Sequence, residues 1–238
     1  MTRLLTITLA ALTAVLLLAS CGSNKRVTGT GNLETDTRRL LTFNEVELQA
    51  PVDVVIVQGE SQSVNVTAQA NIQPLLLTEV KGDKLTIKMM KDANMDNGTN
   101  VEIVIADLES LDISSSGNAV VRDFAEDKFT SKLSGSGNVS MTNVRFDNLK
   151  LNVDGSGDIT VDGQGDDVNI DLSSSGDVDA DSFTANDVQV KSDGSGDVRV
   201  MAKDTLKVEI KGSGNVYYKG NPEVDLKDEG AGELKGNN

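Results

Sequence analysis

The chain has 238 residues, a length that an all-β protein can fill with a single domain. Its 22 basic and 37 acidic side chains give a net charge of -15, which argues against nucleic acid as a partner, because neutralising phosphates requires clustered Lys and Arg. It has no histidine, the commonest general base and metal ligand, and this composition argues against an enzyme.

The first 20 residues are expected to be a secretory signal peptide. One basic residue, Arg3, precedes an apolar stretch over residues 4–18. At about fifteen residues this stretch is short of the ~20 that a helix needs to span a bilayer. A charged start, a short apolar middle and small residues before a break are typical of a cleaved signal.

The break contains the only cysteine of the chain. Leu18-Ala19-Ser20-Cys21 resembles the lipobox of bacterial lipoproteins, whose cysteine becomes the lipid-bearing first residue of the mature protein. A single cysteine also excludes an intramolecular disulfide. We therefore expect lipidation at Cys21 and a membrane-bound protein. Because no Asp follows Cys21, the expected destination is the outer membrane.

Residues 21–37 are expected to form a flexible tether, and residues 38–238 a single β-rich domain. Small polar residues, as in Thr28-Gly29-Thr30-Gly31, favour the tether. Residues 38–110 then show alternating strand patterns such as Val52-Val54-Ile56, separated by turns such as Gly82-Asp83. We interpret this region as irregular first coils or as a capping sheet, because the end of a solenoid must be covered.

From residue 115 onward a small-Ser-Gly-Asn/Asp-apolar unit recurs every 18 to 20 residues. Apolar residues occupy every second position on both sides of each Gly-rich corner, which describes two short strands with one buried face. The repeat predicts a right-handed, single-stranded parallel β-helix with one coil per repeat. The central glycines, expected to be structural turns, are Gly117, Gly137, Gly157, Gly176, Gly196 and Gly214, with a degenerate seventh copy at Gly232.

The residues of each corner suggest its geometry. We expect the central glycine to adopt a positive φ, and the Asn or Asp beside it to favour a tight turn. Three successive copies place Asp158, Asp177 and Asp197 in a ladder along one edge. The favoured interpretation is that these carboxylates cap local backbone, and the alternative is that they hold Ca²⁺ with nearby carbonyl groups. The whole row is Asn118, Asn138, Asp158, Asp177, Asp197 and Asn215.

Taken together, these features resemble the family of putative auto-transporter adhesin head GIN domains. The resemblance covers most of residues 38–236 and implies a β-helical domain on a bacterial envelope lipoprotein. It brings no catalytic or binding residues with it. The motifs that carry it are the lipobox, Arg39-x-x-x-Phe43-x-x-Val46-x-Leu48, Asp53-Val54-x-Ile56-x-Gln58-Gly59, Leu85-x-Ile87 and the repeated corners.

Two further groups have a chemical as well as a structural interpretation. Asp166-Asp167 could serve glycoside hydrolysis or uronate elimination, but adjacent Asp residues mostly mark a polar turn. Tyr217-Tyr218 could stack on a sugar ring, whereas the structural alternative places one ring in the last coil and the other at the surface. We predict no catalytic residue, no cofactor and no resident metal.

The favoured hypothesis is a non-enzymatic cell-envelope lipoprotein that presents a rigid β-helical surface for adhesion or recognition. Its partners would be the membrane, through the lipid anchor, and a glycan or another envelope protein. The alternative is a structural module whose coils stack into homo-oligomers. A third reading, a polysaccharide-active enzyme, has the least support in the sequence.

Overall fold

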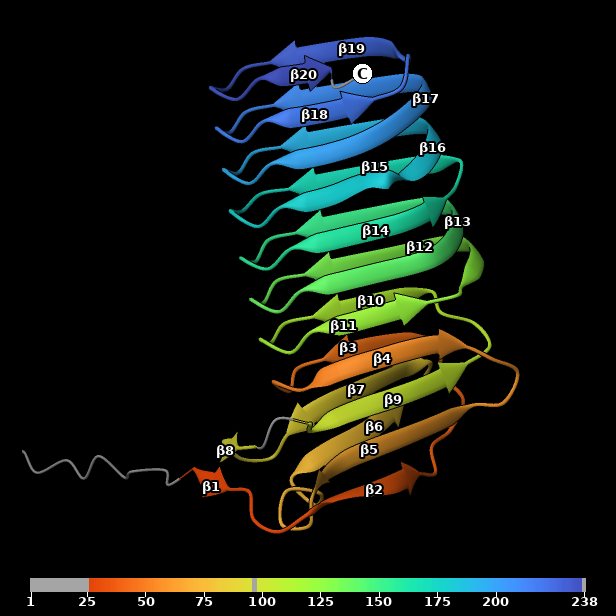
Figure 1. Ribbon diagram of the computed structural model, residues 1–238, viewed down its shortest axis with the longest axis vertical. Helices are drawn as coiled ribbons and strands as arrows, with labels where there is room; N and C mark the ends of the chain where they lie inside the picture. The colour runs from red at the N-terminus through yellow and green to blue at the C-terminus, as the bar shows by residue number, and fades with distance from the viewer. Residues whose placement is uncertain (1–25, 96–97, 237–238) are drawn as a thin grey trace, which may run out of the picture.

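The computed structural model is an all-β solenoid whose strands stack in parallel coils (Figure 1). It describes residues 26–95 and 98–236, so the expected signal peptide, Cys21 and the first residues of the tether lie outside the described residues. No helix in the described ranges is long and apolar enough to cross a membrane. The stacked parallel coils confirm the β-helix class that the repeat predicts.

Each regular coil consists of two strands joined at a Gly-rich corner. In the first, β10 (Ser110–Ile113) leads through the corner to β11 (Ala119–Arg122). In the next, β12 (Ala125–Leu133) leads to β13 (Val139–Val153), which continues around the opposite bend into the following coil. The remaining strands are β14 (Ile159–Gln164), β15 (Asp167–Leu172), β16 (Val178–Ser192), β17 (Val198–Ile210), β18 (Val216–Lys219), β19 (Glu223–Asp228) and β20 (Leu234–Gly236).

The core lies between the two stacked faces of the solenoid. Alternate residues of each strand point inward, as the two-residue period predicts, and equivalent residues of successive coils stack in register. Phe129 and Phe146 stack with ring centroids 4.6 Å apart. Ser131 and Ser192, which interrupt the apolar rows, are buried as well.

In the N-terminal part of the domain the order of coils in space differs from their order in the chain. β3 (Glu45–Leu48) and β4 (Asp53–Gln58) form a coil that stacks on β10 and β11. The later strands β7 (Lys84–Met89) and β9 (Asn100–Ile105) stack on the other side of that coil. The β3–β4 coil therefore lies between β7 and β9 on one side and β10 and β11 on the other, although β7 and β9 come between these two coils in the sequence.

Antiparallel strands close the N-terminal end of the stack (Figure 1). β2 (Leu33–Arg38) pairs with β5 (Ser63–Gln69), β5 pairs with β9, and β6 (Leu76–Lys81) pairs with β7. A two-residue parallel sheet, β1 (Val27–Thr28) with β8 (Ala93–Asn94), lies beside them. Residues 27–28 and 33–37 are thus in strands, and the expectation of a flexible tether is wrong for them because β2 bonds to β5 along its whole length.

The C-terminal end of the stack is open. Among the described residues, β19 pairs only with β17 and β20 only with β18, so the outer edges of both strands are unpaired. Val224 and Leu226 continue the inward apolar rows but are 39% and 44% exposed, because no further coil covers them. In the described part of the chain, the N-terminal end of the solenoid is therefore covered by antiparallel strands, whereas the C-terminal end is uncovered.

Candidate functional site

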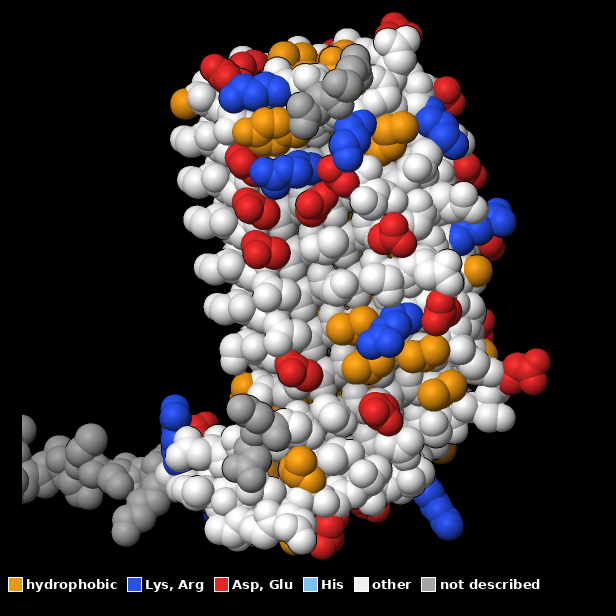
Figure 2. All heavy atoms as spheres, in the orientation of Figure 1, with side chains coloured by type: hydrophobic (Ala, Val, Ile, Leu, Met, Phe, Trp, Pro, Cys, Tyr) orange, Lys and Arg blue, Asp and Glu red, His pale blue; other side chains and the backbone are white. Residues whose placement is uncertain are grey.

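The corner glycines lie where successive coils approach most closely. A methyl group on Gly157 would overlap the carbonyl oxygen of Gly137 and lie 2.8 Å from its carbonyl carbon. None of the six corner glycines has a positive φ, so the conformation expected from the sequence is wrong. These positions exclude a side chain because the backbone of the neighbouring coil fills the space. Figure 2 shows the resulting corner edge as a regular series of projections along one side of the molecule.

The Asn and Asp residues beside these glycines form a continuous ladder. In each rung, Oδ1 accepts a hydrogen bond from the main-chain N–H of the equivalent residue in the next coil, at 2.9 Å from Asn138 to Asn118. The bond is also 2.9 Å from Asp177 to Asp158, and it is 2.7 Å from Asp197 to Asp177. The side chains thus tie each coil to the next.

The ladder begins one rung earlier than the sequence indicates. Asp53 Oδ1 accepts hydrogen bonds from the main-chain N–H of Asn118 at 3.1 Å and from its Nδ2 at 2.9 Å. The sequence pattern missed Asp53 because Pro51-Val52, rather than Ser-Gly, precede it. The one available signal is that an acidic residue directly precedes an alternating strand, as in the regular corners.

The three successive carboxylates have backbone partners. Asp158, Asp177 and Asp197 each use Oδ1 to accept a main-chain N–H. The described part of the chain holds no group of three or more Cys, Asp or Glu side chains placed to hold a metal ion. This geometry is the backbone capping of the favoured interpretation.

Of the other sequence candidates, Tyr217 adjoins the ladder, because the Arg199 side chain over its ring also pairs with Asp197 at 3.6 Å. Asp166 accepts a hydrogen bond from Asn186 Nδ2 at 2.9 Å, which joins two coils. The Tyr217 ring lies beneath the guanidinium of Arg199, 5.1 Å from the ring centroid, and Tyr218 packs against the core. This is the structural arrangement, with one ring in the coil and one at the surface.

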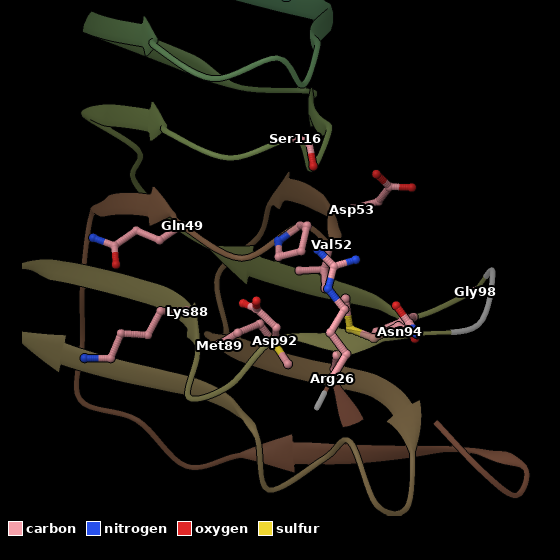
Figure 3. Close-up of a pocket in the computed structure, with 14 residues that line it drawn as sticks. Arg26, Gln49, Val52, Asp53, Lys88, Met89, Asp92, Asn94, Gly98 and Ser116 are labelled. Carbon is pink, nitrogen blue, oxygen red and sulfur yellow. The ribbon is translucent and has the colours of Figure 1, made fainter. Parts of the chain in front are cut away.

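A recess lies below the first regular corner, between the solenoid and the β1–β8 sheet (Figure 3). Its cavity volume is about 830 Å³. Its wall combines the turn between β3 and β4, the segment after β7, the start of β1 and the first corner. We call this recess the notch; its lining includes Arg26, Val52, Asp53, Lys88, Met89, Asp92, Asn94, Met95, Thr99 and Ser116.

The notch is polar and carries charges of both signs. Arg26 and Lys88 line it together with Asp53 and Asp92. Lys88 Nζ hydrogen bonds to Glu79 Oε2 at 2.8 Å, and this contact lowers the pKa of the Glu79 carboxyl. Lys88 is therefore engaged outside the notch, and Arg26 is the basic group most available to a ligand.

One hydroxyl buried behind the wall of the notch has no partner among the described residues. Thr99 is only 8% exposed, and its Oγ1 is buried without a hydrogen bond to any described residue. Buried polar groups in folded proteins are nearly always hydrogen-bonded, because a missing bond costs free energy. Because this oxygen has no accessible surface, it is not available to a ligand in the notch.

The chain leading from the tether is docked against the notch. Val27 N–H donates to Asp92 O at 3.0 Å, and Gly29 N–H donates to Asn94 O at 2.8 Å. Asn71 braces the same segment, accepting from Thr30 N–H at 2.9 Å and donating to Thr28 O at 2.8 Å. These bonds hold Arg26 at the wall of the notch.

Sequence reasoning did not find the notch. Its residues come from segments outside the repeat, and only the Asn97-Gly98 turn beside it has a sequence signature. The order of coils brings these segments together, since β4 stacks between β9 and β11. No local pattern predicts that order.

The chain matches one family model and several solved structures. The model, described as "Putative auto-transporter adhesin, head GIN domain", matches residues 42–222. No curated protein matches the chain. The structure of a putative adhesin from Bacteroides fragilis is similar, with a TM-score of 0.82 and 21% identity over 89% of this chain and 100% of that chain.

Two structures from Parabacteroides distasonis are also similar. One is a putative adhesin, with a TM-score of 0.69 and 25% identity, and the other is a putative lipid binding protein, with a TM-score of 0.73 and 24% identity. Each match covers 90% of this chain and 100% of the other. These likenesses support the solenoid fold.

Proposed function

The chain belongs to the family of putative auto-transporter adhesin head GIN domains, and from this premise we propose that it is a non-enzymatic protein of the bacterial cell envelope that serves adhesion or recognition. The family and the structures similar to it carry descriptions of adhesion or binding, and none of those reported above is described as an enzyme.

The notch is the observation that carries this function. It is large enough for a small ligand, since binding pockets commonly enclose roughly 300–1,000 Å³, and its own volume is about 830 Å³. Part of its wall, the turn between β3 and β4 and the first corner, belongs to stacked coils that the ladder from Asp53 upward ties together. A site built on rigid elements keeps its geometry when a ligand arrives.

The residues of the notch favour binding over catalysis. Nucleophilic catalysis needs a hydroxyl or thiol activated by a neighbouring base. The chain has no histidine, and the Thr99 hydroxyl has no described partner that could take its proton. Asp53 Oδ1 is occupied by the ladder.

We further propose that Cys21 anchors the protein to the outer membrane. Arg26 follows Cys21 by five positions, a span of at most about 18 Å in an extended chain. The notch and the cap would then lie close to the membrane. Residues 1–100 contain 9 basic and 10 acidic side chains, whereas residues 101–238 contain 13 basic and 27 acidic ones. An anionic membrane surface would repel the acidic solenoid and favour its projection away from the lipid.

The test is retention of the full-length chain, purified in detergent, on immobilised envelope polysaccharides and envelope proteins. We expect saturable retention without release of product. Failure of the protein to be retained on either support would contradict the proposal. The appearance of new reducing or unsaturated sugar ends would instead indicate an enzyme.

A further inference from the structure

We propose that the open C-terminal end of the solenoid is a docking site for an extended segment of another protein, which adds as a parallel strand to β19 and places a Lys or Arg side chain over Asp228. The inference goes beyond the proposed function, because it rests on the last coil of the stack and not on the notch. Three observations carry it: the unpaired strand edge, the exposed apolar rows and an acidic side chain at an inward position.

The edge of the last coil offers hydrogen bonds to a further strand. In the described part of the chain, β19 pairs only with β17 and β20 only with β18, and Figure 1 shows both strands in the last layer of the stack. A strand that is paired on one side presents a row of free main-chain N–H and C=O groups on the other. An added strand satisfies such a row, whereas a lipid surface has no matching series of donors and acceptors.

The inward side chains of β19 also lack a cover. Val224 and Leu226 are exposed, although they lie in register with Leu206 and Val208, which are buried. β19 itself covers these two residues of β17, so one more parallel strand would cover β19 in the same way. The added strand therefore needs apolar residues at the positions opposite Val224 and Leu226.

Asp228 gives the site its selectivity. It occupies the third inward position of β19, in register with Ile210, and is exposed. Its Oδ1 accepts a hydrogen bond from Gly230 N–H at 3.1 Å, and no Lys or Arg among the described residues forms an ion pair with it. A strand laid over this position would bury the carboxylate, which is costly unless an opposite charge comes with it. A basic side chain at the third inward position of the partner supplies that charge.

The outer face of β19 extends the pattern. Its side chains alternate in charge with those of the coil below, since Lys207 lies beside Asp225 and Glu209 lies beside Lys227. Opposite charges directly across a strand pair stabilise it, and like charges destabilise it. The partner segment therefore carries a basic residue opposite Asp225 and an acidic one opposite Lys227. In chain order this is an apolar-basic-apolar-acidic-basic run, such as Val-Lys-Leu-Glu-Lys.

A second copy of this chain does not match the C-terminal end. Antiparallel strands cover the N-terminal end of the described stack, so that end offers no open coil to another copy. Two C-terminal ends would bring like charges together, because residues 223–236 contain five acidic and two basic side chains. Both of these lysines are already paired with acidic side chains of the chain itself. A basic segment of a different protein is the occupant with complementary charge.

The experiment measures the binding of fluorescent peptides to the full-length protein in detergent by anisotropy. The matched peptide contains Val-Lys-Leu-Glu-Lys between threonines. One control peptide contains Val-Lys-Leu-Glu-Glu, in which the last charge is reversed, and the other contains Lys-Val-Glu-Leu-Lys, in which the same apolar residues are out of register. Each peptide is titrated into the wild type, Asp228→Lys and Asp228→Asn, which keeps an acceptor for Gly230 N–H. Asp204→Lys, which makes the same change of charge at an exposed position of β17, is the control variant.

We expect the matched peptide to bind the wild type about tenfold more tightly than either control peptide. Asp228→Lys should instead prefer the Val-Lys-Leu-Glu-Glu peptide, Asp228→Asn should bind these two peptides with similar affinity, and Asp204→Lys should keep the wild-type preference. Equal affinity of the wild type for the three peptides, or a preference that Asp228→Lys leaves unchanged, would overturn the inference. A wild type that sediments as an oligomer and binds no peptide would also overturn it, because the occupant would then be a second copy. The peptides do not report on retention by envelope polysaccharides, so the proposed function stands or falls separately.

Discussion

At the scale of single residues, the corner glycines determine how closely the coils can stack, because they lack a Cβ. Successive corners stack so closely that the main chain of one coil occupies the place where a Cβ of the next would lie. The closeness brings the Asn and Asp side chains within reach of the next main-chain N–H. The corner glycine and the Asn or Asp side chain beside it therefore act together to join successive coils.

Gly157→Ala tests whether the close approach of the corners stabilises the stack. The added methyl group would overlap Gly137 O, so the two coils must separate or shift. Overpacking of this kind typically costs about 1–3 kcal/mol, and we expect a loss of about 2 kcal/mol in the free energy of unfolding. Chemical denaturation measures it, with the exposed neighbour Ser156→Ala as the control. Equal stability of the two variants would contradict the close-approach argument.

Ser192→Ala should have the opposite effect. Ser192 is 1% exposed, lies in register between Leu172 and Ile210, and has a buried Oγ without a partner among the described residues. Removing a buried hydroxyl that makes no hydrogen bond should raise the free energy of unfolding by about 1 kcal/mol. Thermal unfolding of the variant, compared with that of the exposed-site variant Ser195→Ala, measures the change. A lower melting temperature would indicate that the hydroxyl does have a partner.

At this scale the sequence predicted positions better than causes. The regular spacing placed the six Asn and Asp residues of the ladder correctly because the same turn recurs in every coil. It misassigned the reason for the glycines, since a recurring glycine is explained equally well by a positive φ and by a close backbone. It missed Thr99, because a partnerless hydroxyl is a property of the folded surroundings.

At the scale of elements, ion pairs join the last strands of the stack. Lys211 and Lys227 both contact Glu209 Oε1, at 2.8 Å and 3.1 Å, and Lys227 also contacts Glu229 at 3.1 Å. Glu209 lies at the end of β17, Lys211 lies in the turn that follows, and Lys227 belongs to β19. The network therefore links the open terminal coil to the coil below it.

This network predicts a pH dependence. Hydrogen bonds from Lys211 and Lys227 lower the pKa of Glu209 from 4.5 to about 2. Because the folded pKa is the lower one, the stabilisation is complete above about pH 4.5 and is lost as the pH falls toward 2. Carbon NMR titration of the Glu209 carboxyl should give this value, and Lys211→Met should move it upward. An unshifted titration in the wild type would show that the pairs do not persist in solution.

The element order shows what periodicity can and cannot predict. The alternating patterns of residues 38–110 predicted first coils or a capping sheet, and both are present. The stacking of β7 and β9 beyond β3 and β4 was not predictable from them, because parallel neighbours can come from any part of the chain. The notch depends on this order, so it was hidden for the same reason.

For the whole molecule, the anchor and the distribution of charge should act together. Because residues 101–238 are acidic and residues 1–100 are nearly neutral, a negatively charged surface should repel the solenoid more strongly than the N-terminal part. In Cys21→Ser cells we expect the protein to leave the membrane fraction and to incorporate no labelled fatty acid. Cell fractionation and metabolic labelling measure both, with Ser23→Ala as the control. Fatty acid still bound to the Cys21→Ser protein would contradict lipidation at this residue.

The open end of the solenoid decides between a recognition protein and a self-assembling one. Unpaired strand edges are templates for association, and natural proteins block them with charges, including charges at inward positions. Asp228 is such a charge: it lies in register with the buried Ile210, where the earlier coils carry Ile113, Leu133 or Val153. It follows Val224 and Leu226 at the third inward position of β19.

Asp228→Leu should therefore convert the protein into one that associates end to end. The substitution completes the apolar rows of the terminal coil and removes the repulsion between two acidic ends. Asp225→Leu is the matched control, because Asp225 lies in register with the exposed Lys207 and adds the same side chain to the outer face. Sedimentation of the full-length proteins in detergent should show a monomeric wild type, a monomeric Asp225→Leu and a dimeric or larger Asp228→Leu. A wild type that already sediments as an oligomer would favour the assembly module instead, because Asp228 would then have failed to protect the only end of the described stack that lacks a cap.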